Sequence, residues 1–242
     1  MRILTLDIET SPHEAYSFNV WQTNILPAQI IAPTYMMTWA AKWYGDPAKS
    51  TVYRTFNDLD FLTCLYDMLS KADLVVGYNH DKFDLRHINR EFLDDGFPPL
   101  RPFATVDMLK VVKQRFNFPH NRLAYVAKIV LGETKLETGG FDLWPAFMEG
   151  DPKAQRIMRR YNIKDTVLTE RLYRKLRPWI RNHPYISQVE VDFDDCLHVY
   201  PCPACGSRGT VLERPRFTRC FAIRQVRCAK CAHWFDGRRK KL

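Results

Sequence analysis

The order of strand-like and helix-like segments restricts this chain to a mixed α/β architecture. Short runs rich in β-branched and aromatic residues predict strands, and apolar residues that recur every three or four positions predict helices. Strands are expected at residues 3–8, 34–43, 51–56, 73–78 and 102–106. Helices are expected at residues 57–72, 83–95, 107–116, 120–131 and 151–176. Three leading strands followed by alternating helices and strands predict a mixed β-sheet with helices packed on its faces.

Capping and breaking residues support these boundaries. Asn57 is placed to cap the first helix, and Gly96 is placed to end the second. The last helix is expected to start near Asp151 and to end before Pro178.

The segment from Ala15 to Ala41 has no charged residue, but asparagine, glutamine and proline interrupt it. A membrane span would not readily tolerate these residues, so we expect a buried or substrate-facing loop and strand. The apolar run at the N-terminus is too short for a signal peptide and contains acids. The sequence therefore predicts a cytoplasmic protein with no membrane partner.

The last 47 residues differ from the rest of the 242-residue chain. They contain six of its seven cysteines, and 11 Lys and Arg against 2 Asp and Glu, whereas residues 1–195 contain 25 of each. We therefore expect a main domain at 1–177, a linker at 178–198 and a small basic module at 199–242. Such charge favours an acidic partner, above all nucleic acid, although a basic surface can also serve only solubility.

Asp7 and Glu9 end the first strand two residues apart. Residues at this spacing share one face of a strand, so Leu6 and Ile8 enter the opposite face. Two carboxylates side by side repel each other unless a cation or water lies between them.

Two further acids lie on other elements. Asp84 follows Asn79 and Phe83 where a strand turns into a helix, and the alternative for an acid at this position is a purely structural N-cap. Asp165 lies on the apolar face of the last helix, one turn after Tyr161. A buried carboxylate there needs a partner, either a metal or a lysine or arginine.

In this order, LDIET, N-x3-FD and Y-x3-D resemble the three motifs of the DEDD (DnaQ-like) 3′-to-5′ exonuclease superfamily, and the tyrosine resembles its DEDDy branch. The resemblance covers about residues 1–177. It implies a ribonuclease H-like fold and hydrolysis with two Mg²⁺ or Mn²⁺ ions held by Asp7, Glu9, Asp84 and Asp165. It also implies that Tyr161 orients the attacking water and that three residues contact the terminal nucleotide: Thr10, Asn79 and Phe83.

Three other residues invite a catalytic interpretation. Asp107 is expected to cap the helix that follows it rather than to join the acids. His80 and His120 are possible general bases, but neither has the position before Asp165 that the histidine branch requires. We expect His80 to be solvated or to face the substrate.

The cysteine pattern at the C-terminus predicts a zinc site. Cys202 and Cys205 form one C-x2-C pair, and Cys228 and Cys231 form another after 22 intervening residues. Two such pairs close a tetrahedral Zn²⁺ site, with disulfides as the alternative. We expect a zinc ribbon whose Phe217, Phe221 and Ile223 pack near the metal. Its arginines are expected to grip nucleic acid, or the ribbon docks a polymerase or replisome protein.

The leading functional prediction is a 3′-to-5′ exonuclease that acts on single-stranded DNA or frayed 3′ ends. Two alternatives stay open. The first is a 3′-end-processing ribonuclease, because ribonuclease D shares the tyrosine branch and the motifs do not distinguish RNA from DNA. The second is a zinc-ribbon binding protein with an inert core. The stretch from Thr105 to Gly140 also resembles predicted exonucleases of bacteria and phages, and for a phage-encoded protein the expected location is the host cytoplasm.

Overall fold

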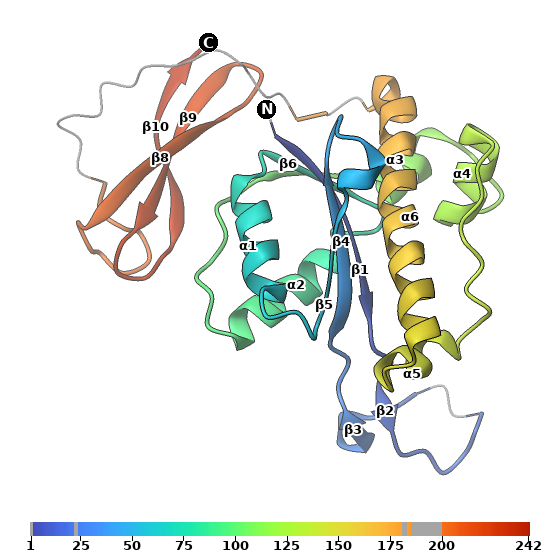
Figure 1. Ribbon diagram of the computed structural model, residues 1–242. Coiled ribbons are helices and arrows are strands. Elements are labelled where there is room, and N and C mark those ends of the chain that lie inside the picture. Colours follow the sequence, from blue (N-terminus) through green and yellow to red (C-terminus); the bar gives the residue numbers. More distant parts are fainter. Residues whose placement is uncertain (1, 22–23, 181–182, 185–199) are drawn as a thin grey trace.

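A mixed five-stranded sheet forms the centre of the larger unit (Figure 1). The computed structural model describes residues 2–21, 24–180, 183–184 and 200–242. The strand order is β5-β4-β1-β6-β7, in which β1 runs antiparallel to β4 and parallel to β6. The strands are β1 (Ile3–Thr10), β4 (Met36–Trp43), β5 (Val52–Thr55), β6 (Leu74–Gly77) and β7 (Ala104–Asp107). The predicted fold class is therefore confirmed.

Helices cover both faces of this sheet, as Figure 1 shows. One face packs against α1 (Phe61–Lys71) and α2 (Asp84–Asp94). The other face packs against α3 (Met108–Arg115), α4 (Leu123–Leu131), α5 (Leu143–Met148) and α6 (Pro152–Leu176). No helix among the described residues is long and apolar enough to cross a membrane.

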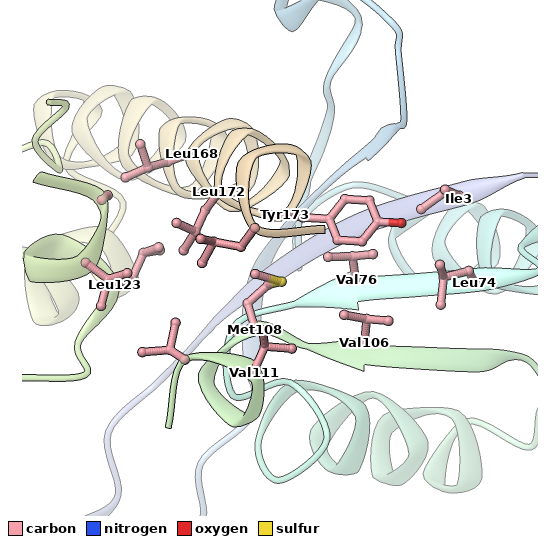
Figure 2. Close-up of a cluster of buried hydrophobic side chains, with 14 residues drawn as sticks. Ile3, Leu74, Val76, Val106, Met108, Val111, Leu123, Leu168, Leu172 and Tyr173 are labelled. Carbon is pink, nitrogen blue, oxygen red and sulfur yellow. The ribbon is translucent and has the colours of Figure 1, made fainter. Parts of the chain in front are cut away.

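Strand β1 sends alternate side chains into the two helical layers. Leu4, Leu6 and Ile8 are buried with α1 and α2, whereas Ile3 is buried in the cluster formed with α6. Figure 2 shows this second cluster, in which Leu172 and Tyr173 of α6 lie over the sheet. The alternation predicted from the sequence therefore directs Asp7 and Glu9 toward α6.

Most predicted boundaries agree with the structure to within a few residues, and the differences have local causes. Helix α1 starts at Phe61, because the Asp58 carboxylate accepts the Thr55 N–H at 2.7 Å and forms a turn before the helix. The predicted cap at Asn57 is therefore wrong. Asp151 does cap α6, since its carboxylate accepts the N–H groups of Lys153 and Ala154.

The segment between β1 and β4 contains two short strands that the sequence did not predict, β2 (Glu14–Ala15) and β3 (Ile30–Ala32). The tip of this segment is not buried, because Phe18, Val20 and Trp21 are exposed, and the alternative of a substrate-facing loop stays a prediction. Figure 1 shows the β2–β3 pair beyond the end of β1.

The C-terminal residues form a separate three-stranded antiparallel sheet, ordered β10-β9-β8. Its strands are β8 (Thr210–Phe217), β9 (Phe221–Cys228) and β10 (Trp234–Lys241). Arg214 contacts the larger unit by donating to the Lys71 carbonyl oxygen at 2.9 Å and pairing with Asp73 at 3.2 Å. Most of the predicted linker at 178–198 lies outside the described residues.

Candidate active site

Three carboxylates from β1 and α6 converge at the end of β1. One oxygen each of Asp7, Glu9 and Asp165 lies within 4.8 Å of the others. Asp165 is 2% exposed, and its Oδ1 has no hydrogen-bond partner among the described residues. The structure thus brings together acids that are 158 positions apart in the sequence, from Asp7 to Asp165.

Burial and mutual repulsion make the ionised form of these acids unfavourable. Burial, followed by the charge of Asp165, raises the pKa of Asp7 well above its usual value. The same causes raise the pKa of Glu9 to about 8. A cluster that resists ionisation in this way becomes stable as carboxylates once a cation neutralises it.

Asp84 is adjacent to this group but is held differently. It is the first residue of α2, and its Oδ1 accepts the Ile8 N–H at 3.0 Å. Burial raises its pKa to about 7, and its charge contributes to the raised pKa of Asp7. The N-cap alternative is wrong, because Phe83 is the capping residue and the Asp84 side chain reaches β1 instead.

Lys135 pairs with Asp165, a contact that the sequence did not identify. Its ammonium forms an ion pair with Asp165 and donates to the Tyr161 hydroxyl at 3.3 Å. Burial disfavours its charge, but Asp165, Tyr161 and Asp7 outweigh burial and raise the pKa of Lys135. The salt bridge that the sequence offered as the alternative partner of Asp165 is therefore present, and it involves a carboxylate that also belongs to the acidic cluster.

Asn162 is a second residue that the sequence did not identify. It is fully buried on α6, and its Nδ2 donates to Asp7 Oδ2 at 2.7 Å and to the Asp7 carbonyl oxygen at 3.2 Å. Its Oδ1 accepts the Thr38 hydroxyl at 3.2 Å. Asn162 thereby fixes the orientation of the Asp7 carboxylate from the same helix that carries Asp165.

The three residues predicted to contact a nucleotide lie next to the acids along the chain. Thr10 ends β1, directly after Glu9. Asn79 has a left-handed backbone conformation (φ 66°) in the turn between β6 and α2. Phe83 precedes Asp84, is 38% exposed and packs against the His87 ring, with centroids 4.7 Å apart. Their contact with a substrate remains a prediction.

The remaining sequence candidates lie outside the group formed by Asp7, Glu9 and Asp165, although the charge of Asp107 contributes to the raised pKa of Asp84. Asp107 caps α3 as expected, since its carboxylate accepts the Leu109 N–H at 3.0 Å. His80 is fully buried, so the prediction of a solvated or substrate-facing side chain is wrong. Burial lowers its pKa. His120 is exposed and packs edge-on against Tyr125.

A basic groove of about 560 Å³ lies between Lys135 and one side of α6. Lys164 and Arg171 in its lining are paired with Glu133. The five basic residues that line it are Lys135, Arg159, Arg160, Lys164 and Arg171. The sequence assigned the net positive charge to the tail, whereas the fold also concentrates cations beside the acids.

The four predicted zinc ligands come together in the three-stranded unit, with all Sγ atoms within 4.8 Å of one another. Cys202 and Cys231 Sγ are 3.7 Å apart, and Cys205 and Cys228 Sγ are 3.6 Å apart. Thiolates about 2.3 Å from one tetrahedral Zn²⁺ stand roughly 3.8 Å apart. The spacing fits a shared ion rather than disulfide bonds of about 2.05 Å.

One detail of the expected ribbon is wrong. Phe217 pairs with Ala222, whereas Cys228 pairs with Thr210 at the other end of the same two strands. The aromatic residues Phe217 and Phe221 therefore lie away from the cysteines, because antiparallel pairing places the β8–β9 turn opposite the sulfur cluster.

Comparison with known proteins places the larger unit in a family. Residues 4–177 match the RNase_H_2 family of the RNase_H superfamily. The match covers more than half of the chain, so the chain belongs to this superfamily, whose members are typically metal-dependent nucleases. No curated protein matches the sequence.

The fold is also similar to a solved polymerase structure. The family B DNA polymerase from the hyperthermophilic archaeon Pyrobaculum calidifontis matches with a TM-score of 0.54 and 20% identity. The match covers 73% of this chain and 24% of the polymerase chain. At this identity the likeness concerns the fold alone.

Proposed function

We propose that this protein is a 3′-to-5′ exonuclease of the tyrosine branch that hydrolyses nucleic-acid phosphodiesters with two divalent cations. Its preferred substrate is single-stranded DNA or a frayed 3′ end. The observation that carries the proposal is the convergence of Asp7, Glu9 and Asp165 within 4.8 Å, in a setting that raises the pKa of Asp7 and Glu9. Superfamily membership supports a nuclease.

The donor set fits Mg²⁺ or Mn²⁺, because every candidate ligand is a carboxylate oxygen. The buried, unpartnered Oδ1 of Asp165 is available to a cation. Asp7 is assigned to both ions, and Glu9, Asp84 and Asp165 complete their ligands. Bound there, the cations would polarise the phosphate and lower the pKa of the attacking water.

The other side chains of the site hold the water and the carboxylates in position or neutralise part of the negative charge. Burial raises the pKa of Tyr161, so its phenol stays protonated and orients water by hydrogen bonding instead of accepting a proton. Asn162 holds Asp7, and Lys135 neutralises part of the acidic cluster. Thr10, Asn79 and Phe83 are assigned to the terminal nucleotide.

The basic groove along α6 is assigned to the phosphates of the substrate strand. Its lining includes Lys135, which also contacts the acidic cluster, and this shared residue supports the assignment of the groove to the strand that enters the site. Among the described residues, neither Arg159 nor Arg160 forms an ion pair. The Arg159 guanidinium lies over the Tyr53 ring, 5.7 Å from its centroid, so no carboxylate of the described residues neutralises either cation, and we assign both to phosphate oxygens.

We assign residues 1–177 to the nuclease domain, 178–198 to a linker and 199–242 to a zinc ribbon with four cysteine ligands. The ribbon contacts the larger unit beside Asp73, next to the start of β1. Seven residues of β1 separate this end from Glu9, which is roughly 23 Å at about 3.3 Å per residue. A strand held by both units would have to cover this distance. A polymerase or replisome protein is the other partner considered for the ribbon.

The test is digestion of DNA and RNA oligonucleotides labelled at the 3′ or the 5′ end, in Mg²⁺ or Mn²⁺. The parent protein is expected to release the 3′ label as a mononucleotide and to shorten the 5′-labelled strand stepwise. Asp7→Ala is expected to do neither, and Glu149→Gln, an exposed acid outside the site, is the matched control. Equal digestion by the parent and Asp7→Ala would overturn the proposal. Faster digestion of RNA would favour the ribonuclease alternative.

A further inference from the structure

A second cluster of potential metal ligands lies at the junction of β6 and β7. His80 and Asp81 are in the turn that follows β6, and Asp107 ends β7. The two strands pair in parallel with Gly77 opposite Asp107, which brings the turn next to the end of β7. One ligand atom from each of His80, Asp81 and Asp107 lies within 4.8 Å of the others.

The buried atoms of this cluster lack partners. His80 is 0% exposed, and neither ring nitrogen meets hydrogen-bond geometry among the described residues, although Nε2 lies 3.4 Å from Asp81 Oδ1. Asp107 is 4% exposed, and its Oδ2 is likewise unpartnered. Buried polar atoms are normally satisfied, so two side chains with free atoms at one place indicate a missing ligand.

The other atoms of the cluster already hold the ligands in position. Asp107 Oδ1 accepts the N–H groups of Asn79 at 2.9 Å and Leu109 at 3.0 Å, so only Oδ2 remains. Asp81 Oδ2 accepts the Lys110 ammonium at 2.5 Å, while Asp81 Oδ1 lies 3.4 Å from His80 Nε2. Outer partners of this kind orient metal-binding carboxylates.

The position of the imidazole is also fixed by packing. A Cβ atom on residue 77 would come within 2.6 Å of His80 Cβ, so the ring occupies space that only a glycine leaves open. Any larger residue at position 77 would therefore displace His80 from the cluster. Its place in the cluster is built into the fold.

We infer that His80, Asp81 and Asp107 bind a divalent transition-metal ion, Zn²⁺ or Mn²⁺, at a site separate from the catalytic carboxylates and the cysteines. One imidazole and two carboxylates form a mixed donor set that suits these ions better than Ca²⁺ or Mg²⁺. The ion ties the β6–α2 turn, which carries Asn79 and Asp84, to the start of α3. Its role is structural support of the substrate side of the site.

The test counts bound metal and needs no nuclease activity, so it is independent of the proposed function. The test uses full-length protein with the substitution Asp7→Ala, which weakens metal binding at the catalytic carboxylates. The protein is incubated with Zn²⁺ or Mn²⁺, unbound ions are removed by gel filtration, and the bound metal is measured. Adding Asp81→Asn or His80→Gln is expected to remove about one equivalent per chain of the ion that binds. The exposed control His120→Gln is expected to remove none.

A thermal unfolding series accompanies the metal count. Added metal is expected to raise the unfolding temperature of the Asp7→Ala protein more than that of its Asp81→Asn form. If His80→Gln does not fold, Asp81→Asn still decides the question, because Asp81 is partly exposed. Equal metal content in the Asp81→Asn and His120→Gln proteins would overturn the inference.

Discussion

Neutralising Glu9 should make the metal-free protein more stable at alkaline pH. The folded protein raises the pKa of Glu9 from 4.5 to about 8, first through burial and then through Asp165. The folded state therefore holds this proton more tightly than the unfolded chain does. Stability from Glu9 is present at acidic pH and is lost as the pH rises from about 4.5 to about 8.

The magnitude follows from the size of the shift. At about 1.36 kcal/mol per pKa unit, the full change corresponds to at most roughly 5 kcal/mol. Glu9 is only half-buried and shares its proton equilibrium with Asp7 and Asp165, so water and coupling reduce the expected effect to about 2 kcal/mol. Glu9→Gln should remove that amount of pH-dependent destabilisation.

Urea denaturation between about pH 5 and pH 9, followed by circular dichroism in buffer without added divalent cations, measures this difference. The parent should lose stability across the range, Glu9→Gln should lose about 2 kcal/mol less, and the exposed control Glu149→Gln should behave as the parent. Added Mg²⁺ should flatten the parent's profile. Parallel profiles for the parent and Glu9→Gln would refute the idea that the cluster is held together against its own charge.

Three further changes test the surroundings of the acids. Asn162→Ala removes the amide that holds Asp7 and should lower the nuclease rate about 10–100-fold, whereas Thr169→Ala, buried on the same helix away from Asp7, should lower stability alone. Unchanged initial rates in folded Asn162→Ala protein would remove Asn162 from the site. Lys135→Met removes a cation that competes for Asp165, so calorimetry should find several-fold tighter Mg²⁺ binding, and weaker binding would contradict the competition. Replacing Arg159 and Arg160 together by alanine should weaken single-stranded DNA binding and reduce the salt slope by about 1.4, while two exposed lysines replaced outside the groove serve as the control. An unchanged slope in fluorescence anisotropy would exclude the groove as the path of the strand.

The elements that a regular spacing of apolar residues marks in the sequence could be predicted. Strand β1 alternates between two environments, so its pattern placed Asp7 and Glu9 on one face before the structure was known. The helical period likewise placed Asp165 on the packed face of α6. Both patterns depend only on neighbouring residues in the sequence. The packing of the sheet against α6 preserves the side-chain directions that they predict.

The parts that depend on contacts between distant segments could not be predicted. Lys135 lies in a segment without regular structure, so no periodicity marks it, and only the folded chain brings it to Asp165. Asn162 is an ordinary polar helix residue until Asp7 is placed beside it. Asp84 was ambiguous because helix-initial acids commonly cap, and the deciding contact with Ile8 is 76 positions away.

Anomalous diffraction from crystals of the protein grown with Mn²⁺ tests the two-cation centre most directly. We expect two peaks bounded by Asp7, Glu9, Asp84 and Asp165, about 3.5–4 Å apart, with the Lys135 ammonium displaced from Asp165. An empty carboxylate cluster that keeps the Lys135–Asp165 ion pair at saturating Mn²⁺ would contradict the assignment of these acids as metal ligands.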